Sequence, residues 1–338
     1  MILPGLVLPD DTQENWEVRR ELIRKRITDF QGEVCQAPVD LDVEVLGEED
    51  CGSYVRKKVS YMMAEGDRSF AYLLMPKEIE QPAPAVICFH GTNTLGKDIM
   101  IAESPETRNR NYAEKLAERG YVCLAPDFFC AGERLAEGEL PYDKNPFFER
   151  FPKWSAHGKG AYDGARDVDY LLTLPEVDGK RIATIGHSLG GDRAVHTAVY
   201  DERIALVVCS CGLWPHFGYH KRAMHATGYI KGWEDKNPLA NLRFKEYARE
   251  LKDYPYEVHE IYAMISPRPL LLTYGFTDSN TNNLVMNHEV MEHVHQLYKF
   301  LGKEHHFAHL FHGDGHDSLP WVQEMMYGFL GRYLKGDG

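Results

Sequence analysis

The sequence predicts an α/β fold with a mostly parallel central sheet, helices on both faces, antiparallel N-terminal strands and a lid insertion. Residues 85–89 are an unbroken apolar run, which is typical of a strand buried on both faces of a parallel sheet, and residues 121–127 form the next predicted strand. A helical pattern over 109–119 separates them, so this segment has the strand, helix, strand order of a βαβ unit. A further apolar strand, at 181–185, leads through Ser188 into a helix.

Length and composition predict one folded catalytic domain. The chain has 338 residues, of which 43% are hydrophobic and 26% charged, as in an ordinary globular protein. We predict a helix and edge-strand extension at 1–69 and a catalytic domain at 70–338. The formal net charge of −13 argues against nucleic acid and anionic membranes as partners, because both are bound through clustered Lys and Arg.

Cysteine usage and the start of the chain point to a cytoplasmic protein. The seven cysteines are odd in number, and several lie in apolar runs where a thiol behaves as a small buried hydrophobe, which favours reduced thiols. Residues 1–5 lack the basic and apolar segments of a signal peptide, and no run reaches the ~18 apolar residues of a membrane span. The sequence leaves open whether the chain forms a homo-oligomer.

The remaining elements follow from periodicity and turn residues. Residues 13–30 have a loose helical pattern, residues 39–76 alternate as antiparallel strands do, and residues 128–160 have the Gly and Pro content of a loop. The downstream order is a helix at 163–174, the strand and helix around Ser188, a strand at 204–209, a lid insertion at 212–262, a strand at 270–275, a helix at 289–300, a strand at 306–311 and a closing helix at 319–334.

The spacing Gly186-x-Ser188-x-Gly190 is typical of a nucleophile elbow. A sharp strand-to-helix turn holds the serine in strained geometry, and side chains at the two glycine positions would collide with neighbouring elements. The turn exposes the serine hydroxyl at a helix N-terminus, where the N–H of Leu189 faces a developing oxyanion. The alternative, an ordinary turn serine, does not require both glycines.

A serine alcohol needs an imidazole base, which in turn needs an orienting carboxylate. Asp278 follows the strand at 270–275, and His316 follows the last strand. The chain order Ser188, Asp278, His316 is the order that this architecture imposes. Asp314 and Asp317 are rival acids, but they lie within two residues of His316 and reach its far nitrogen with difficulty.

The second oxyanion donor is expected from the loop after the strand at 85–89. The sequence His90-Gly91 brings the backbone there close to the nucleophile. We predict the N–H of Thr92, with Asn93 as the alternative. His90 itself is interpreted as a structural hydrogen-bonding residue.

The lid insertion supplies the candidate substrate-binding residues Trp214, Phe217 and Trp233, although aromatic side chains of this kind also form a lid's own small core. Histidines are dense between His305 and His316. They lack the carboxylate or cysteine spacing that completes a tetrahedral metal site. We therefore expect no metal and no organic cofactor.

Over about residues 70–335 the chain resembles the α/β-hydrolase superfamily. The segments that carry the closer resemblance, to its dienelactone-hydrolase-like and acetyl xylan esterase-like branch, are His90-Gly91-Thr92-Asn93 with Gly96-Lys97-Asp98, Ala125-Pro126-Asp127, Gly186-His187-Ser188-Leu189-Gly190-Gly191 and Gly315-His316-Asp317. The resemblance implies ester hydrolysis through an acyl-serine, with Ser188 as nucleophile, His316 as base and Asp278 as orienting acid. It also implies an oxyanion hole made by Leu189 and Thr92.

The predicted function is a serine carboxylic ester hydrolase acting on short, acetyl-type acyl groups, with acetylated sugars among the candidate substrates. One alternative is a serine peptidase of the prolyl-oligopeptidase type, which shares the elbow and the residue order. That type usually carries a β-propeller, whose repeats this sequence lacks. The other alternative is a non-catalytic binding protein on a hydrolase scaffold, which commonly loses a member of the triad.

Overall fold

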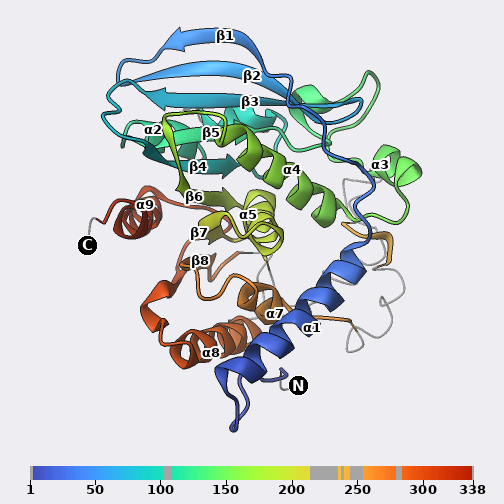
Figure 1. The fold of residues 1–338 in the computed structure, drawn as a ribbon, viewed down its shortest axis with the longest axis vertical. Coiled ribbons are helices and arrows are strands. Elements are labelled where there is room, and N and C mark those ends of the chain that lie inside the picture. Colours follow the sequence, from blue (N-terminus) through green and yellow to red (C-terminus); the bar gives the residue numbers. More distant parts are fainter. Residues whose placement is uncertain are drawn as a thin grey trace.

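A nine-stranded sheet organises the part of the chain that the structure describes (Figure 1). The structure, a computed structural model, describes residues 3–101, 109–213, 235–236, 240–243, 254–278 and 284–336. The strand order is β1-β2-β3-β5-β4-β6-β7-β8-β9. Strands β1 to β3 pair antiparallel with their neighbours, and all pairs from β5 to β9 are parallel. The predicted mostly parallel sheet with antiparallel N-terminal strands is therefore confirmed.

The strands are β1 (Glu44–Asp50), β2 (Tyr54–Ala64), β3 (Asp67–Pro76), β4 (Ala83–Phe89), β5 (Val122–Pro126), β6 (Val177–His187), β7 (Ile204–Ser210), β8 (Leu270–Gly275) and β9 (Phe307–His312). Every residue of β4, β5 and β8 is buried. Burial on both faces explains why these strands are continuous apolar runs without alternation.

Helices cover both faces of the sheet. They are α1 (Gln13–Gln31), α2 (Tyr112–Ala117), α3 (Asn145–Arg150), α4 (Ala156–Leu171), α5 (Leu189–Tyr200), α7 (Val258–Ala263), α8 (Leu284–Phe300) and α9 (Pro320–Leu334), with 3₁₀ turns η1 (Gly96–Met100), η2 (Gly132–Arg134) and η5 (Glu304–His306). One core joins the sheet to α1, α4, α5, α7 and α8, and a second joins it to α2 and α9 (Figure 1). Within the described ranges, no helix has the length and apolar character needed to cross a bilayer.

The first strand lies later in the chain than predicted. The alternation that starts at residue 39 predicted that the first strand begins there, whereas β1 spans Glu44–Asp50 and is exposed along its whole length. The reason is the hairpin to β2, which closes through the Cys51 N–H to Tyr54 carbonyl bond and a left-handed Gly52 (φ 84°). Pairing propagates from this turn, so its position rather than the apolar alternation decides where β1 lies.

Helix α4 begins earlier than predicted, at Ala156 instead of 163. Its N-cap is Ser155, whose Oγ accepts a hydrogen bond from the Gly158 N–H at 2.9 Å. Gly158 and Gly160 lower the helical propensity at the start of α4, so the sequence predicts a helix only from residue 163. Gly158 has a packing reason, because a Cβ there would lie 2.6 Å from Nε1 of Trp154.

A buried ion-pair cluster ties the start of β3 to α4. Asp163 on α4 accepts from Arg134 Nη1 at 2.7 Å and from Lys159 Nζ at 2.6 Å, and both cations also contact Asp67. The side chains of Asp163, Arg134 and Lys159 are at most 3% exposed. Removing one partner from such a cluster leaves charge buried without compensation.

We therefore expect Asp163→Ala to lower the free energy of unfolding by about 3 kcal/mol, measured by urea denaturation. Asp29→Ala is the matched control, because Asp29 pairs with Lys25 on the surface of α1, where the two side chains are 62% and 71% exposed. That change should cost less than about 1 kcal/mol. Equal losses in the two variants would contradict a structural role for the buried cluster.

Candidate active site

Ser188 lies at the turn between β6 and α5 in strained backbone geometry. Its φ of 58° and ψ of −125° fall outside the regions that an ordinary side chain prefers. A Cβ on Gly186 would lie 2.2 Å from the carbonyl carbon of Gly190, and a Cβ on Gly190 would lie 2.0 Å from the carbonyl oxygen of Phe89. Both glycines of the elbow pattern are thus required by close backbone approach, as the sequence predicted.

The loop after β4 lies against this turn. A Cβ on Gly91 would be 2.9 Å from the His187 carbonyl oxygen and 3.5 Å from Cβ of Ser188. The Asn93 N–H donates to Oη of Tyr142 at 3.0 Å, and the same hydroxyl lies 2.8 Å from the Asn93 carbonyl oxygen. The Asn93 N–H is therefore bound to Tyr142, which favours Thr92 over Asn93 as the second oxyanion donor.

His90 stabilises this loop through hydrogen bonds of its two ring nitrogens. Its Nε2 accepts from the Phe128 N–H at 3.0 Å, so Nδ1 carries the proton and donates to the Gly91 carbonyl at 2.8 Å. Burial, and then the charge of Arg193, lower the pKa of His90 to about 4. The contacts are those of the structural hydrogen-bonding residue that the sequence indicated.

Asp278 and His316 are brought together by the loops that follow β8 and β9. Oδ2 of Asp278 lies 2.7 Å from Nδ1 of His316. Asp278 is buried, whereas the His316 side chain is 28% exposed. The His316 loop packs closely on β8, since a Cβ on Gly275 would lie 2.1 Å from the Asp314 carbonyl oxygen.

The two rival acids have other partners. Asp317 accepts from Arg110 Nη1 at 2.5 Å, and Oδ2 of Asp314 lies 3.4 Å from Nδ1 of His312. The structure therefore pairs the imidazole of His316 with Asp278, the acid that the chain order favoured.

His316 also lies beside the nucleophile turn. Its ring is 4.6 Å, centre to centre, from the ring of His187, the residue that precedes Ser188. The Ser188 N–H donates to the Ser210 carbonyl at 2.8 Å at the end of β7. Ser188 and the His316 to Asp278 pair thus gather at the carboxyl ends of β6, β8 and β9.

Two further residues at this end of the sheet were not found from the sequence. Tyr142 holds the loop after β4, and Arg110 contacts the His316 loop. These partners lie between 49 and 207 positions away in the chain, so no local pattern marks either residue.

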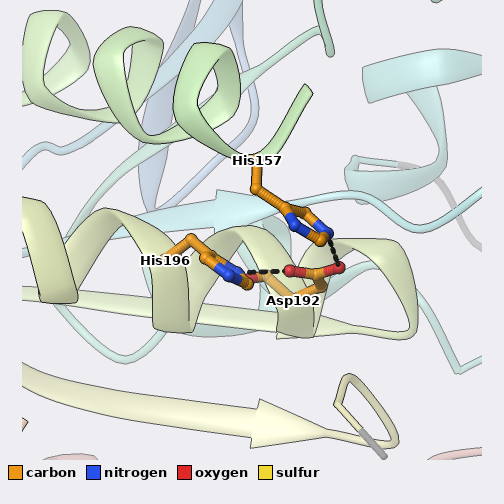
Figure 2. Close-up of side chains that lie close together, drawn as sticks. All are labelled: His157, Asp192 and His196. Carbon is orange, nitrogen blue, oxygen red and sulfur yellow. Dashed lines mark hydrogen bonds and ion pairs between the residues drawn. The ribbon is translucent and has the colours of Figure 1, made fainter. Parts of the chain in front are cut away.

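A cluster of His157, Asp192 and His196 lies between α4 and α5 (Figure 2). Asp192 Oδ2 is 3.1 Å from His157 Nε2, Oδ1 is 2.5 Å from His196 Nδ1, and the two rings stack at 4.3 Å with 11° between their planes. Burial lowers the pKa of both imidazoles, but at His196 the charge of Asp192 outweighs it and raises the pKa.

This cluster is built as a hydrogen-bonded ion pair rather than as a ligand set. His196 Nδ1 also lies 3.0 Å from the Asp192 carbonyl, which requires a proton on that nitrogen, and parallel rings do not aim two lone pairs at one ion. It joins α5, the helix that follows Ser188, to the start of α4.

The candidate substrate-binding residues Trp214, Phe217 and Trp233 lie outside the described residues. The same holds for most of the predicted lid insertion at 212–262, of which the structure describes 212–213, 235–236, 240–243 and 254–262, including the start of α7.

Comparison with known proteins agrees with the fold and with the class of chemistry. Residues 145–302 match a family profile described as glucuronyl esterase of fungi. A glucuronoyl esterase structure from Solibacter usitatus superimposes with a TM-score of 0.75 at 19% identity, covering 98% of this chain and 97% of that one. The described part of the chain has the α/β-hydrolase fold.

Sequence relatives of this α/β-hydrolase include YtaP of Bacillus subtilis, 29% identical over 64% of the chain and 67% of the relative. A carbohydrate esterase, MZ0003, from an unknown prokaryotic organism is 23% identical over 67% of the chain and 60% of the relative. The chain thus spans about two thirds or less of these relatives. The predicted class, a carboxylic ester hydrolase, is confirmed, and a non-catalytic scaffold is not favoured.

Proposed function

We propose that this α/β-hydrolase is a serine esterase that cleaves esters of sugar acids, with Ser188 as nucleophile, His316 as base and Asp278 as orienting acid. The single observation that carries the chemistry is the 2.7 Å contact between Asp278 and His316 beside the strained Ser188 turn. Because Nδ1 of His316 is bound to Asp278, we assign Nε2 as the nitrogen that accepts the serine proton.

The reaction proceeds in two halves. Ser188 Oγ attacks the ester carbonyl while His316 Nε2 takes its proton, and the N–H groups of Leu189 and Thr92 stabilise the oxyanion. His316 then returns the proton to the leaving alcohol, which gives an acyl-serine. Water attacks this intermediate with His316 again as base, and the acid is released.

Support for a sugar acid as the acyl part comes from the comparisons. The glucuronyl esterase profile spans residues 145–302, a range that contains Ser188, Asp278 and the lid insertion between them. In a glucuronoyl ester the sugar supplies the carboxyl group, whereas in an acetylated sugar it supplies the alcohol. The proposal therefore revises the acetyl-type substrate expected from the sequence, and Trp214, Phe217 and Trp233 of the lid remain proposed contacts for the sugar.

The experiment is a comparison of kcat/KM for the methyl ester of glucuronic acid, acetylated xylose and p-nitrophenyl acetate. We expect the uronate ester to be cleaved at least tenfold better than acetylated xylose. The reverse order would keep the serine esterase and overturn the sugar-acid substrate. Absence of labelling of Ser188 by a fluorophosphonate, together with no turnover of any ester, would overturn the esterase itself.

A further inference from the structure

Arg110 lies where the chain enters α2 and reaches across to the loop that carries His316. Its guanidinium makes three contacts with groups around that histidine. Nη1 donates to Asp317 Oδ1 at 2.5 Å, Nη2 donates to the His316 carbonyl at 3.2 Å, and Nη2 lies 3.3 Å from Nε2 of His187. Arg110 therefore touches the main chain of His316, the residue after it and the ring packed against it.

The carboxylate of Asp317 is fixed from several sides. Besides Arg110, it accepts from Nδ2 of Asn109 at 3.1 Å and from the Ser318 N–H at 2.8 Å. Burial would raise the pKa of Asp317, but the hydrogen bond and charge of Arg110 outweigh it and lower the pKa. The charge of Arg110 is thus balanced by a carboxylate that stays ionised.

His187 is neutral because it is buried and lies against the same guanidinium. Arg110 can only donate, so Nε2 of His187 accepts. Nδ1 therefore carries the proton and donates a hydrogen bond to Oγ of Ser210 at 3.0 Å. Burial, and next the charge of Arg110, lower the pKa of His187 well below its usual range. A neutral ring therefore lies 4.6 Å from the ring of His316.

We propose that Arg110 is a positioning residue for His316, which fixes the histidine loop through the His316 carbonyl and Asp317 while Asp317 cancels its charge. This inference rests on the proposed function, in which His316 is the base. A cation that held the loop without a partner would disfavour the imidazolium that forms in the reaction. The Arg110 to Asp317 pair supplies the rigidity without that electrostatic cost.

Charged or titratable groups contact or closely approach His316 from several segments that the structure describes. They are Asp278 after β8, Cys211 after β7, His187 at the end of β6, Arg110 before α2, and Asp317 in its own loop. Burial raises the pKa of Cys211 to about 12, so its thiol is neutral. Of this set, Arg110 and Asp317 can be changed without touching the Asp278 contact.

The test uses Arg110→Met, Asp317→Asn and the double variant, with Arg119→Met as the matched control. Arg119 lies just beyond α2 and donates to Glu324 of α9, so it has the same charge and other partners. For each variant the pH profiles of kcat and kcat/KM and the thermal midpoint are measured with the preferred ester.

Opposite shifts are expected for the two single variants. Arg110→Met leaves the Asp317 carboxylate uncompensated, which favours protonated imidazole and moves the acid limb of kcat/KM to higher pH by about one unit. Asp317→Asn leaves the guanidinium uncompensated and moves the limb to lower pH by a similar amount. In the double variant the acid limb of kcat/KM returns to its wild-type pH, but the His316 loop is still not held in place. We therefore expect kcat to be roughly 10- to 100-fold lower than in wild type, both in Arg110→Met and in the double variant, with KM little changed.

Three results would overturn the inference. Recovery of full kcat in the double variant would mean that the pair acts by charge alone. A fall in kcat with no shift of the limb in either single variant would mean that Arg110 only supports folding, and no fall beyond that of Arg119→Met would remove it from the site. A separate measurement tests the proposed function itself. If His316→Asn turned over the ester as fast as wild type, His316 would not be the base.

Discussion

Ser188→Ala is expected to lower kcat/KM for the preferred ester by about 10⁴-fold or more, with KM changed little. Without the hydroxyl no acyl-enzyme can form, and only binding and the two proposed oxyanion N–H groups remain to accelerate direct attack by water. Alanine fits the turn as well as serine does, because the strain at φ 58° belongs to the backbone. The loss should therefore appear in turnover and not in the thermal midpoint.

The matched control for this variant is Ser53→Ala. Ser53 is an exposed serine in the turn between β1 and β2, far along the sheet from β6. Its removal should leave kcat/KM within about twofold of wild type. Near-full turnover of p-nitrophenyl acetate by Ser188→Ala would place the nucleophile elsewhere.

Strands buried on both faces were predicted well from the sequence, because burial leaves an unbroken apolar run. Strands β4, β5 and β8 are of this kind. The edge strand β1 was misplaced because all of its residues are exposed, so its apolar side chains report no buried face. Its position depends on the turn at Gly52 instead.

Helix starts were predicted less well where glycine serves tertiary packing. The first turns of α4 hold Gly158 and Gly160, and Gly164 follows, where a Cβ would lie 2.2 Å from Oγ1 of Thr197 on α5. Close packing of α4 on α5 needs Gly164, and contact of α4 with Trp154 needs Gly158. A prediction from helical propensity includes only the local destabilisation that glycine causes in a helix, and not this packing.

The candidate site shows the same difference between features that follow from local sequence and features that depend on tertiary contacts. Ser188, Asp278 and His316 follow strands directly, and strand ends meet at one edge of a parallel sheet, so their association could be predicted from order alone. Arg110 and Tyr142 lie in loops and meet their partners through side chains, and only the folded chain shows those contacts. The sequence therefore predicts the proposed reacting groups better than the residues that hold them in place.

Asp278→Asn is expected to lower kcat by about 10³- to 10⁴-fold, measured at the pH optimum with the preferred ester. Asparagine can keep the 2.7 Å contact, but its amide can donate to Nδ1, which selects the tautomer with a proton on Nε2, where the serine proton must go. The imidazolium also loses its balancing charge.

Asp314→Asn is the matched control, because Asp314 contacts His312 and not His316, and it should retain kcat within a few-fold. Comparable losses in both variants would move the orienting acid into the histidine's own loop.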